Sequence, residues 1–142
     1  MAYTTIDDPD VYFQVKLYTG TGSTLAVTLD GAADMQPDLI WIEVRNETSS
    51  AMIQDSVRGT DGTSYRAMKP SADSAESTNS GFLTTIGSNG FTVGTNGKFN
   101  AADDTYIASC WKETADAGFD IVIYDGTGSA RTISHSLSAV PH

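Results

Sequence analysis

The chain has 142 residues, a length typical of one domain, with eight Lys and Arg residues against 18 Asp and Glu residues. The resulting net charge of −10, with no basic cluster to offset it, would repel both a nucleic-acid backbone and an anionic membrane surface. No apolar run approaches the ~20 residues of a membrane-spanning helix. From the charge and the missing apolar run, we expect neither nucleic-acid binding nor membrane insertion.

The first predicted element is a hairpin. Residues 1–10 are polar and acidic, and we expect an N-terminal arm there. Apolar and polar side chains then alternate over residues 11–18 and again over 25–29, which predicts two strands that each have one apolar face. The Gly-Thr-Gly-Ser-Thr run between them predicts a tight turn, because glycine adopts positive φ at no steric cost. A phosphate-binding loop is disfavoured, because a strand rather than a helix follows the glycines.

The middle of the chain predicts more short strands. Residues 39–44 are apolar on both faces up to Glu43, which is typical of a central strand covered on both sides. Further strands are expected over 51–57, 65–68, 82–86, 91–94 and 106–111, with a long irregular loop over 65–80 and no convincing helix. This pattern predicts an all-β fold, an antiparallel β-sandwich of jelly-roll or concanavalin-like type, over residues 11–112.

The segment 119–135 repeats the segment 13–29 without a gap. Six positions are identical, at Phe13/Phe119, Tyr18/Tyr124, Gly20/Gly126, Thr21/Thr127, Gly22/Gly128 and Ser23/Ser129. We therefore expect residues 113–142 to form a linker and a partial second copy, a C-terminal β-hairpin arm. A lone hairpin is marginal in water. It could pack on the first unit, add to a neighbouring subunit, or belong to a second domain of a longer protein. We favour its use between subunits.

Five motifs in order carry a resemblance to a known family. They are FQVKLYTGTGST, QPDLIWIEVRN, IQDSVRG, NGFTVG and DDTYIASCWK, followed by the restart GFDIVIYDGTG. Together they resemble a module, often in tandem, of structural proteins of tailed bacteriophages, especially marine ones. The chain departs from this family at Glu43, where Lys is usual, and at Cys110, where an aromatic or small residue is common.

The resemblance implies a place on a virion, in a tail fibre, a head fibre or a capsid decoration, for a protein made in the host cytoplasm. The partners would be other virion subunits, and we expect a homotrimer. No catalytic residue or cofactor comes with the resemblance, and we expect no enzyme. The alternative function is a carbohydrate-binding module for a host glycan, with the loop over residues 65–80 and neighbouring tips as the contact surface.

A few side chains are candidates for ligand binding. Arg45, Asp55 and Arg58 lie beside apolar strands and could form a polar glycan pocket. We prefer an Arg–Asp pair that closes the sandwich end, since Arg and carboxylate groups form bidentate pairs. Tyr18 and, in the long loop, Tyr65 are the aromatic candidates, because alternation turns Tyr18 to the polar face.

Other chemistry has weaker support in the sequence. Trp41 and Trp111 could stack on a sugar, but both lie in apolar strands and we expect them in the core. Asn100, Asp103 and Asp104 could offer oxygens to Ca²⁺, but the further spaced carboxylates of a calcium loop are missing, so we predict no metal site. Cys110, the single cysteine, is expected to be a small buried hydrophobe.

Overall fold

A computed structural model describes residues 6–140 of the chain. The expected N-terminal arm therefore lies partly outside the described residues. Within them, a 3-10 helix η1 (Pro9–Val11) begins after Asp8, whose side chain accepts a hydrogen bond from the Asp10 backbone N–H at 3.0 Å. This is an ordinary N-terminal cap, and it leads directly into the first strand.

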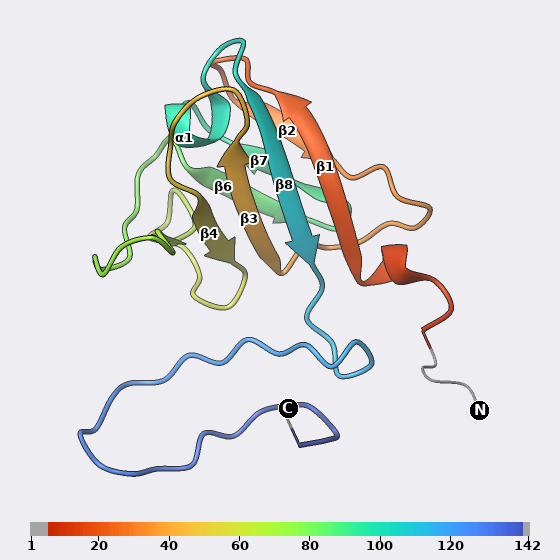
Figure 1. Ribbon diagram of the computed structural model, residues 1–142, viewed down its shortest axis with the longest axis vertical. Coiled ribbons are helices and arrows are strands. Elements are labelled where there is room, and N and C mark those ends of the chain that lie inside the picture. Colours follow the sequence, from red (N-terminus) through yellow and green to blue (C-terminus); the bar gives the residue numbers. More distant parts are fainter. Residues whose placement is uncertain (1–5, 141–142) are drawn as a thin grey trace.

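The predicted all-β sandwich is confirmed, since two antiparallel sheets pack face to face (Figure 1). The larger sheet has the strand order β1-β8-β3-β4-β5 and the smaller one β2-β7-β6. The strands are β1 (Phe13–Thr19), β2 (Leu25–Thr28), β3 (Leu39–Val44), β4 (Met52–Asp55), β5 (Ala67–Met68), β6 (Leu83–Gly87), β7 (Gly90–Val93) and β8 (Thr105–Trp111). One short helix, α1 (Gly97–Asn100), is present, although the sequence predicts no convincing helix.

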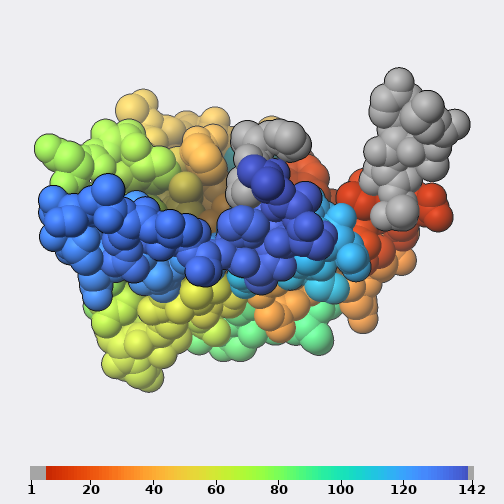
Figure 2. Space-filling view, turned by 90° about the horizontal axis from the view of Figure 1, so that it is seen from below, coloured from red at the N-terminus to blue at the C-terminus, as the bar shows by residue number. Residues whose placement is uncertain are grey.

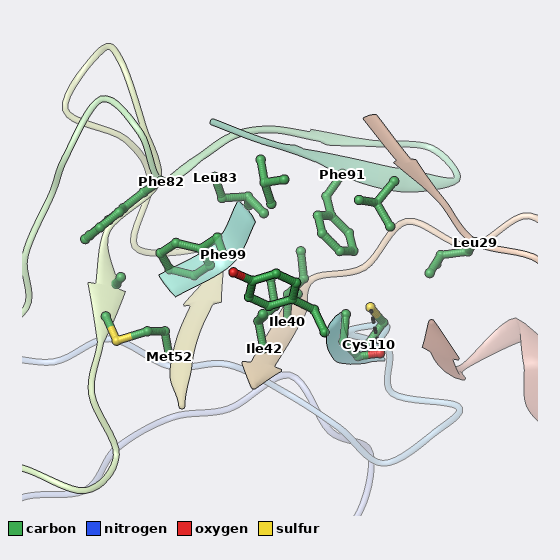
Figure 3. Close-up of a cluster of buried hydrophobic side chains, with 14 of the residues drawn as sticks. Leu29, Ile40, Ile42, Met52, Phe82, Leu83, Phe91, Phe99 and Cys110 are labelled. Atoms are coloured by element: carbon green, nitrogen blue, oxygen red, sulfur yellow. Dashed lines mark hydrogen bonds between the residues drawn. The ribbon is translucent and has the colours of Figure 1, made fainter. Parts of the chain in front are cut away.

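The core lies between the two sheets (Figure 3). Alternate residues of β3 and β8 point into it, among them Ile40, Ile42, Tyr106 and Cys110, all at most 1% exposed. The smaller sheet, α1 and the loops contribute Val27, Leu29, Met35, Phe82, Leu83, Phe91, Val93 and Phe99. Because each fully buried large aliphatic or aromatic side chain contributes roughly 1.5–3 kcal/mol, this cluster is the main stabilising element of the fold.

The expected hairpin over residues 13–29 is wrong in its pairing. β1 pairs with β8, whereas β2 pairs with β7 in the other sheet. The Gly-rich turn is thus a corner that passes the chain from one sheet to the other. Asn100 holds it: the side-chain amide accepts from Thr21 N–H at 2.7 Å and donates to the Ser23 carbonyl at 2.5 Å. Short-range alternation predicts the strands, but it carries no information on this contact across 79 residues.

The second copy, over residues 119–135, forms no strand, so the predicted C-terminal hairpin is wrong for the chain as described. Its turn nevertheless repeats the first one. Gly22 and Gly128 both have φ of 70°, and the hydroxyl of Thr21 or Thr127 donates to the carbonyl two residues on, at 2.9 and 3.3 Å. The turn geometry is therefore local, whereas strand formation also needs a neighbouring strand, and none of the described sheet strands pairs with the second copy.

Candidate functional site

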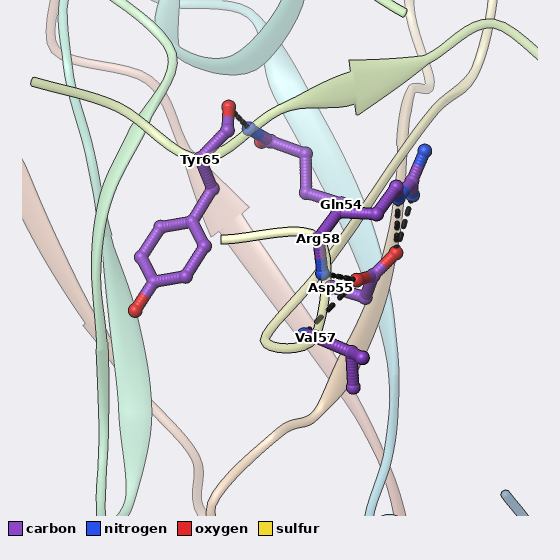
Figure 4. Close-up of polar contacts among 5 residues, drawn as sticks. All are labelled: Gln54, Asp55, Val57, Arg58 and Tyr65. Carbon is purple, nitrogen blue, oxygen red and sulfur yellow. Dashed lines mark hydrogen bonds and ion pairs between the residues drawn. The ribbon is translucent and has the colours of Figure 1, made fainter. Parts of the chain in front are cut away.

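Asp55 and Arg58 form an ion pair, so the expected Arg–Asp pair is confirmed, with Arg58 rather than Arg45 as the arginine (Figure 4). Asp55 is buried, and one of its oxygens accepts backbone N–H groups from Val57 and Arg58 at 3.1 and 2.7 Å. The other oxygen accepts from the Arg58 side chain, from Nε and Nη2, both at 2.5 Å. The carboxylate thus closes the turn after β4, which is a structural role.

The other ligand candidates do not join this pair. Arg45 is exposed beyond the opposite end of β3 and its backbone N–H bonds the Thr105 carbonyl at 2.7 Å. Tyr65 packs against the core, its carbonyl accepts from Gln54 Nε2 at 2.7 Å, and its ring points away from the Asp55–Arg58 pair (Figure 4). The five sequence-predicted residues therefore do not form one pocket.

Tyr18 is turned inward, contrary to the expected surface position. Its hydroxyl donates to the Phe99 carbonyl at 2.7 Å, and its ring stacks on Tyr106 with the centroids 5.1 Å apart. Burial is the main cause that raises the pKa of Tyr18, with Tyr106 and Cys110 adding to it. The hydroxyl stays protonated and structural, because the polar face of β1 is the one that faces the other sheet.

The apolar face of β1 points outward instead, and it continues over the whole five-stranded sheet. We define the outer face by its apolar strand residues, which are Phe13, Val15, Leu17, Leu39, Trp41, Ile53, Met68, Ile107 and Trp111. Val15, Leu17 and Trp41 are 45%, 53% and 36% exposed. The expectation that Trp41 lies in the core is therefore wrong, and Trp111 is only partly buried.

The outer face is nearly uncharged. Along the register, Val15, Ser109, Trp41, Ile53 and Met68 form one row across all five strands. The row beside it contains Glu43, whose carboxylate accepts from Trp41 Nε1 at 3.3 Å. Since contiguous exposed apolar surface of this kind marks interaction sites in soluble proteins, the outer face is the candidate functional site. Its sequence signal was the apolar run on both faces of residues 39–44.

The C-terminal segment, residues 113–140, lies along one end of this face (Figures 1 and 2). Phe119 shares an aromatic pocket of about 240 Å³ with Tyr12, Phe13 and Trp111. Residues 121–124 share a second pocket, about 380 Å³, with Leu39, Ile53, Met68 and the Asp55–Arg58 pair. Residues 119 and 121–124 of the second copy therefore line pockets together with one end of the outer face in their own chain.

Few polar contacts attach this segment to the sandwich. The Glu113 backbone N–H donates to Asp38 at 2.9 Å, whereas the bond that the Glu113 side chain accepts from the Ile121 N–H, at 3.1 Å, lies within the segment. Burial first, then the nearby Asp120 and Asp38 carboxylates, raise the pKa of Glu113. Among the described residues, no hydrogen bond or ion pair joins 122–140 to the sandwich.

The Cys110 thiol and the Asn100 amide, which the sequence raised as candidates for chemistry, are buried within the fold. Burial raises the pKa of the Cys110 thiol to about 12, which makes it unreactive at neutral pH. The Asn100 amide is occupied by Thr21, Ser23 and Gly94, so it is not available to Ca²⁺. Over residues 6–140, no three His, Cys, Asp or Glu side chains are grouped to hold a metal ion. In the same part of the chain, no helix has the length and apolarity to cross a membrane.

Comparison with known protein families gives a match that covers nearly the whole chain. Residues 8–142 match DUF7483, a domain of unknown function. The chain belongs to this family. The DUF7483 match includes both the sandwich and the C-terminal segment, so the two are parts of one family unit. No curated protein and no solved structure matches the chain.

Proposed function

We propose that the protein is a structural subunit of a phage virion, in a tail fibre, head fibre or capsid decoration, that binds other virion subunits through the outer face. The virion assignment rests on the five sequence motifs given above. The subunit-binding role is supported by one observation, the exposed and nearly uncharged apolar surface of the five-stranded sheet.

Physical reasoning favours a protein partner for this surface. An apolar sheet face in water gains roughly 25 cal/mol for each Å² that a partner covers. A nucleic acid would be repelled by the net charge of −10, and an open sheet face offers no cleft with paired carboxylates for catalysis. The proposed partners are copies of this chain, arranged as a homotrimer, and other subunits of the particle.

The test is the mass of the purified full chain in solution by light scattering. We expect an oligomer, and we expect Leu17→Lys to shift it toward monomer because the ammonium group would be buried without a partner. Thr28→Lys is the matched control, since Thr28 is an exposed strand residue on the smaller sheet. A monomeric wild-type chain at high concentration would contradict the proposal, as would equal effects of the two substitutions.

A second candidate is recognition of a host glycan. It is favoured by the exposed Trp41 ring and by the four aromatic side chains around the 240 Å³ pocket, since aromatic faces can stack on sugar rings. Titration with oligosaccharides while tryptophan fluorescence is recorded separates the two functions. Saturable quenching that Trp41→Ala abolishes would favour the glycan, and no change would remove this candidate.

A further inference from the structure

The free edge of β1 is the starting observation. β1 is the first strand of the five-stranded sheet and pairs on one side only, with β8. Beside it lies a groove of about 320 Å³, lined by Phe13, Gln14, Val15 and, from flanking segments, Asp10, Asp30 and Gly31. An edge strand presents unpaired N–H and C=O groups, so a seven-residue edge of this kind can accept a further strand.

The same chain carries a second seven-residue stretch with the sequence pattern of β1. Residues 119–125 repeat the pattern of β1, with Phe119, Ile121 and Ile123 in the places of Phe13, Val15 and Leu17. In the structure they form no strand, and Ile123 and Tyr124 are 54% and 61% exposed. The pattern forms a strand at residues 13–19, where β8 is its neighbour, whereas no sheet strand among residues 6–140 pairs with residues 119–125.

We propose that residues 119–125 of one copy add as an antiparallel strand to the free edge of β1 in a second copy, with Ile121 opposite Val15. This deepens the proposed function and rests on it, because it names the partner and the contact by which subunits join. The added strand would extend the larger sheet to six strands and satisfy backbone groups on both chains.

This register is supported by side-chain complementarity. It places Phe119 opposite Leu17 and Ile123 opposite Phe13, so the apolar row of the outer face continues onto the added strand. It also places Asp120 opposite Lys16, whose ammonium already lies 2.8 Å from Asp30 on the surface. Opposite charges in direct cross-strand positions stabilise a pairing. A parallel arrangement with the repeats aligned would place the apolar Val122 at Lys16 and leave Asp120 opposite Gln14.

The geometry favours a second copy over the strand's own chain. In its own chain Phe119 shares a pocket with Phe13, and its backbone makes two hydrogen bonds with Thr114, at 3.0 and 3.2 Å. The register requires Phe119 beside Leu17, four residues along β1 and therefore roughly 13 Å away. Each copy would donate one strand and accept one, a head-to-tail contact that can close into a ring such as a trimer.

Single-cysteine variants test this contact in the full chain. A Val15→Cys chain is mixed with an Ile121→Cys chain under mild oxidation, so that a disulfide-linked heterodimer reports only contacts between copies. Directly opposed antiparallel residues lie within disulfide range. Cys110 can remain, because it is buried and its thiol is held protonated. The matched control pairs Val15→Cys with Val140→Cys, a position that is 80% exposed on the same segment.

We expect several-fold more heterodimer from Val15→Cys with Ile121→Cys than from the control pair. Equal yields would overturn the proposal. If the wild-type chain is an oligomer by light scattering but this cross-link is absent, strand addition fails while subunit binding stands. If the wild-type chain is a monomer, both fail.

Hydrogen exchange of the unmodified chain gives a second measurement that needs no variant. Amides of residues 13–19 and 119–125 should both exchange more slowly at high protein concentration than at low concentration. The edge strands of the smaller sheet, β2 and β6, serve as the internal reference and should not change. Concentration-independent exchange in residues 119–125 would overturn the proposal.

Discussion

The Asp55 carboxylate is the most fully satisfied charged group in the larger sheet. It accepts two backbone N–H groups and two N–H groups of Arg58, and its side chain is only 3% exposed. An ion pair so far from water contributes little by its mere presence. Removal of one partner is costly, however, because the other charge is then left buried and unpaired.

We therefore expect Asp55→Ala to lower the free energy of unfolding by about 3–5 kcal/mol. Urea unfolding followed by tryptophan fluorescence measures the change. The control is Glu76→Ala, which breaks the pair with Arg66, where both side chains are more than a third exposed. Such a pair contributes at most ~1 kcal/mol. Similar losses in the two variants would show that Arg58 finds another partner in the absence of Asp55.

Some residue positions could be predicted from the sequence and others could not. The Asp55–Arg58 pair and the buried Cys110 are confirmed, because adjacent opposite charges and a thiol inside an apolar run leave few alternatives. The predictions that Tyr18 lies on the surface and Trp41 in the core are wrong. β1 alternates and β3 is apolar on both faces, so a pattern alone does not say which face meets the second sheet. In β1 the inward face is the polar one, with Gln14 held by loop carbonyls and Tyr18 by Phe99.

At the scale of elements, the two copies of the Gly-Thr-Gly-Ser turn form a natural comparison. In the first copy, a Cβ at Gly20 would collide with the Ala101 carbonyl oxygen, since the corner packs directly on the loop after α1. In the second copy, nothing lies within 4 Å of a Cβ at Gly126. Identical sequence is thus under different packing constraints.

We expect Gly20→Ala to destabilise the fold by about 1–3 kcal/mol, because the corner must move away from Ala101. Gly126→Ala, the matched control, should change the unfolding free energy by less than about 0.5 kcal/mol. Thermal unfolding of both variants by circular dichroism compares them. Equal destabilisation would mean that Gly126 also packs closely, as it could in an assembled form.

The elements themselves were more predictable than their pairing. β3 occupies the predicted residues, and β4, β6, β7 and β8 lie within one or two residues of the predicted strand ends or inside the predicted spans. The hairpin was wrong because β1 bonds a strand about 90 residues later, which no local signal specifies. The predicted hairpin in the second copy was wrong for a related reason, since a sequence with strand propensity does not form a stable strand without a neighbouring strand.

At the scale of the whole molecule, charge opposes self-association. Each chain carries a net charge of −10, while the outer face is nearly neutral, so like charges outside the interface repel when two copies meet. Salt screens this repulsion, with a Debye length of about 10 Å at 0.1 M ionic strength.

We therefore expect the oligomeric fraction to rise with salt, for example from about 0.01 M to about 0.2 M NaCl, over which screening becomes strong. Sedimentation velocity at fixed protein concentration measures it. Dissociation on addition of salt would point the other way, to ion pairs such as Lys16–Asp120 as the main source of affinity rather than the apolar face.

The position of β8 has a consequence for how the chain reaches this structure. β8 is the last strand of the sandwich in the sequence, yet it lies between β1 and β3 and pairs with both of them. During synthesis on the ribosome, the first strand has no neighbour until residues 105–111 have emerged. Contacts of such high sequence separation must close long loops first, which places the protein among the slow, high-contact-order folders. Until then, the backbone edges of β1 and β3 that β8 will pair stay open, and this is the period in which a nascent chain most needs a chaperone.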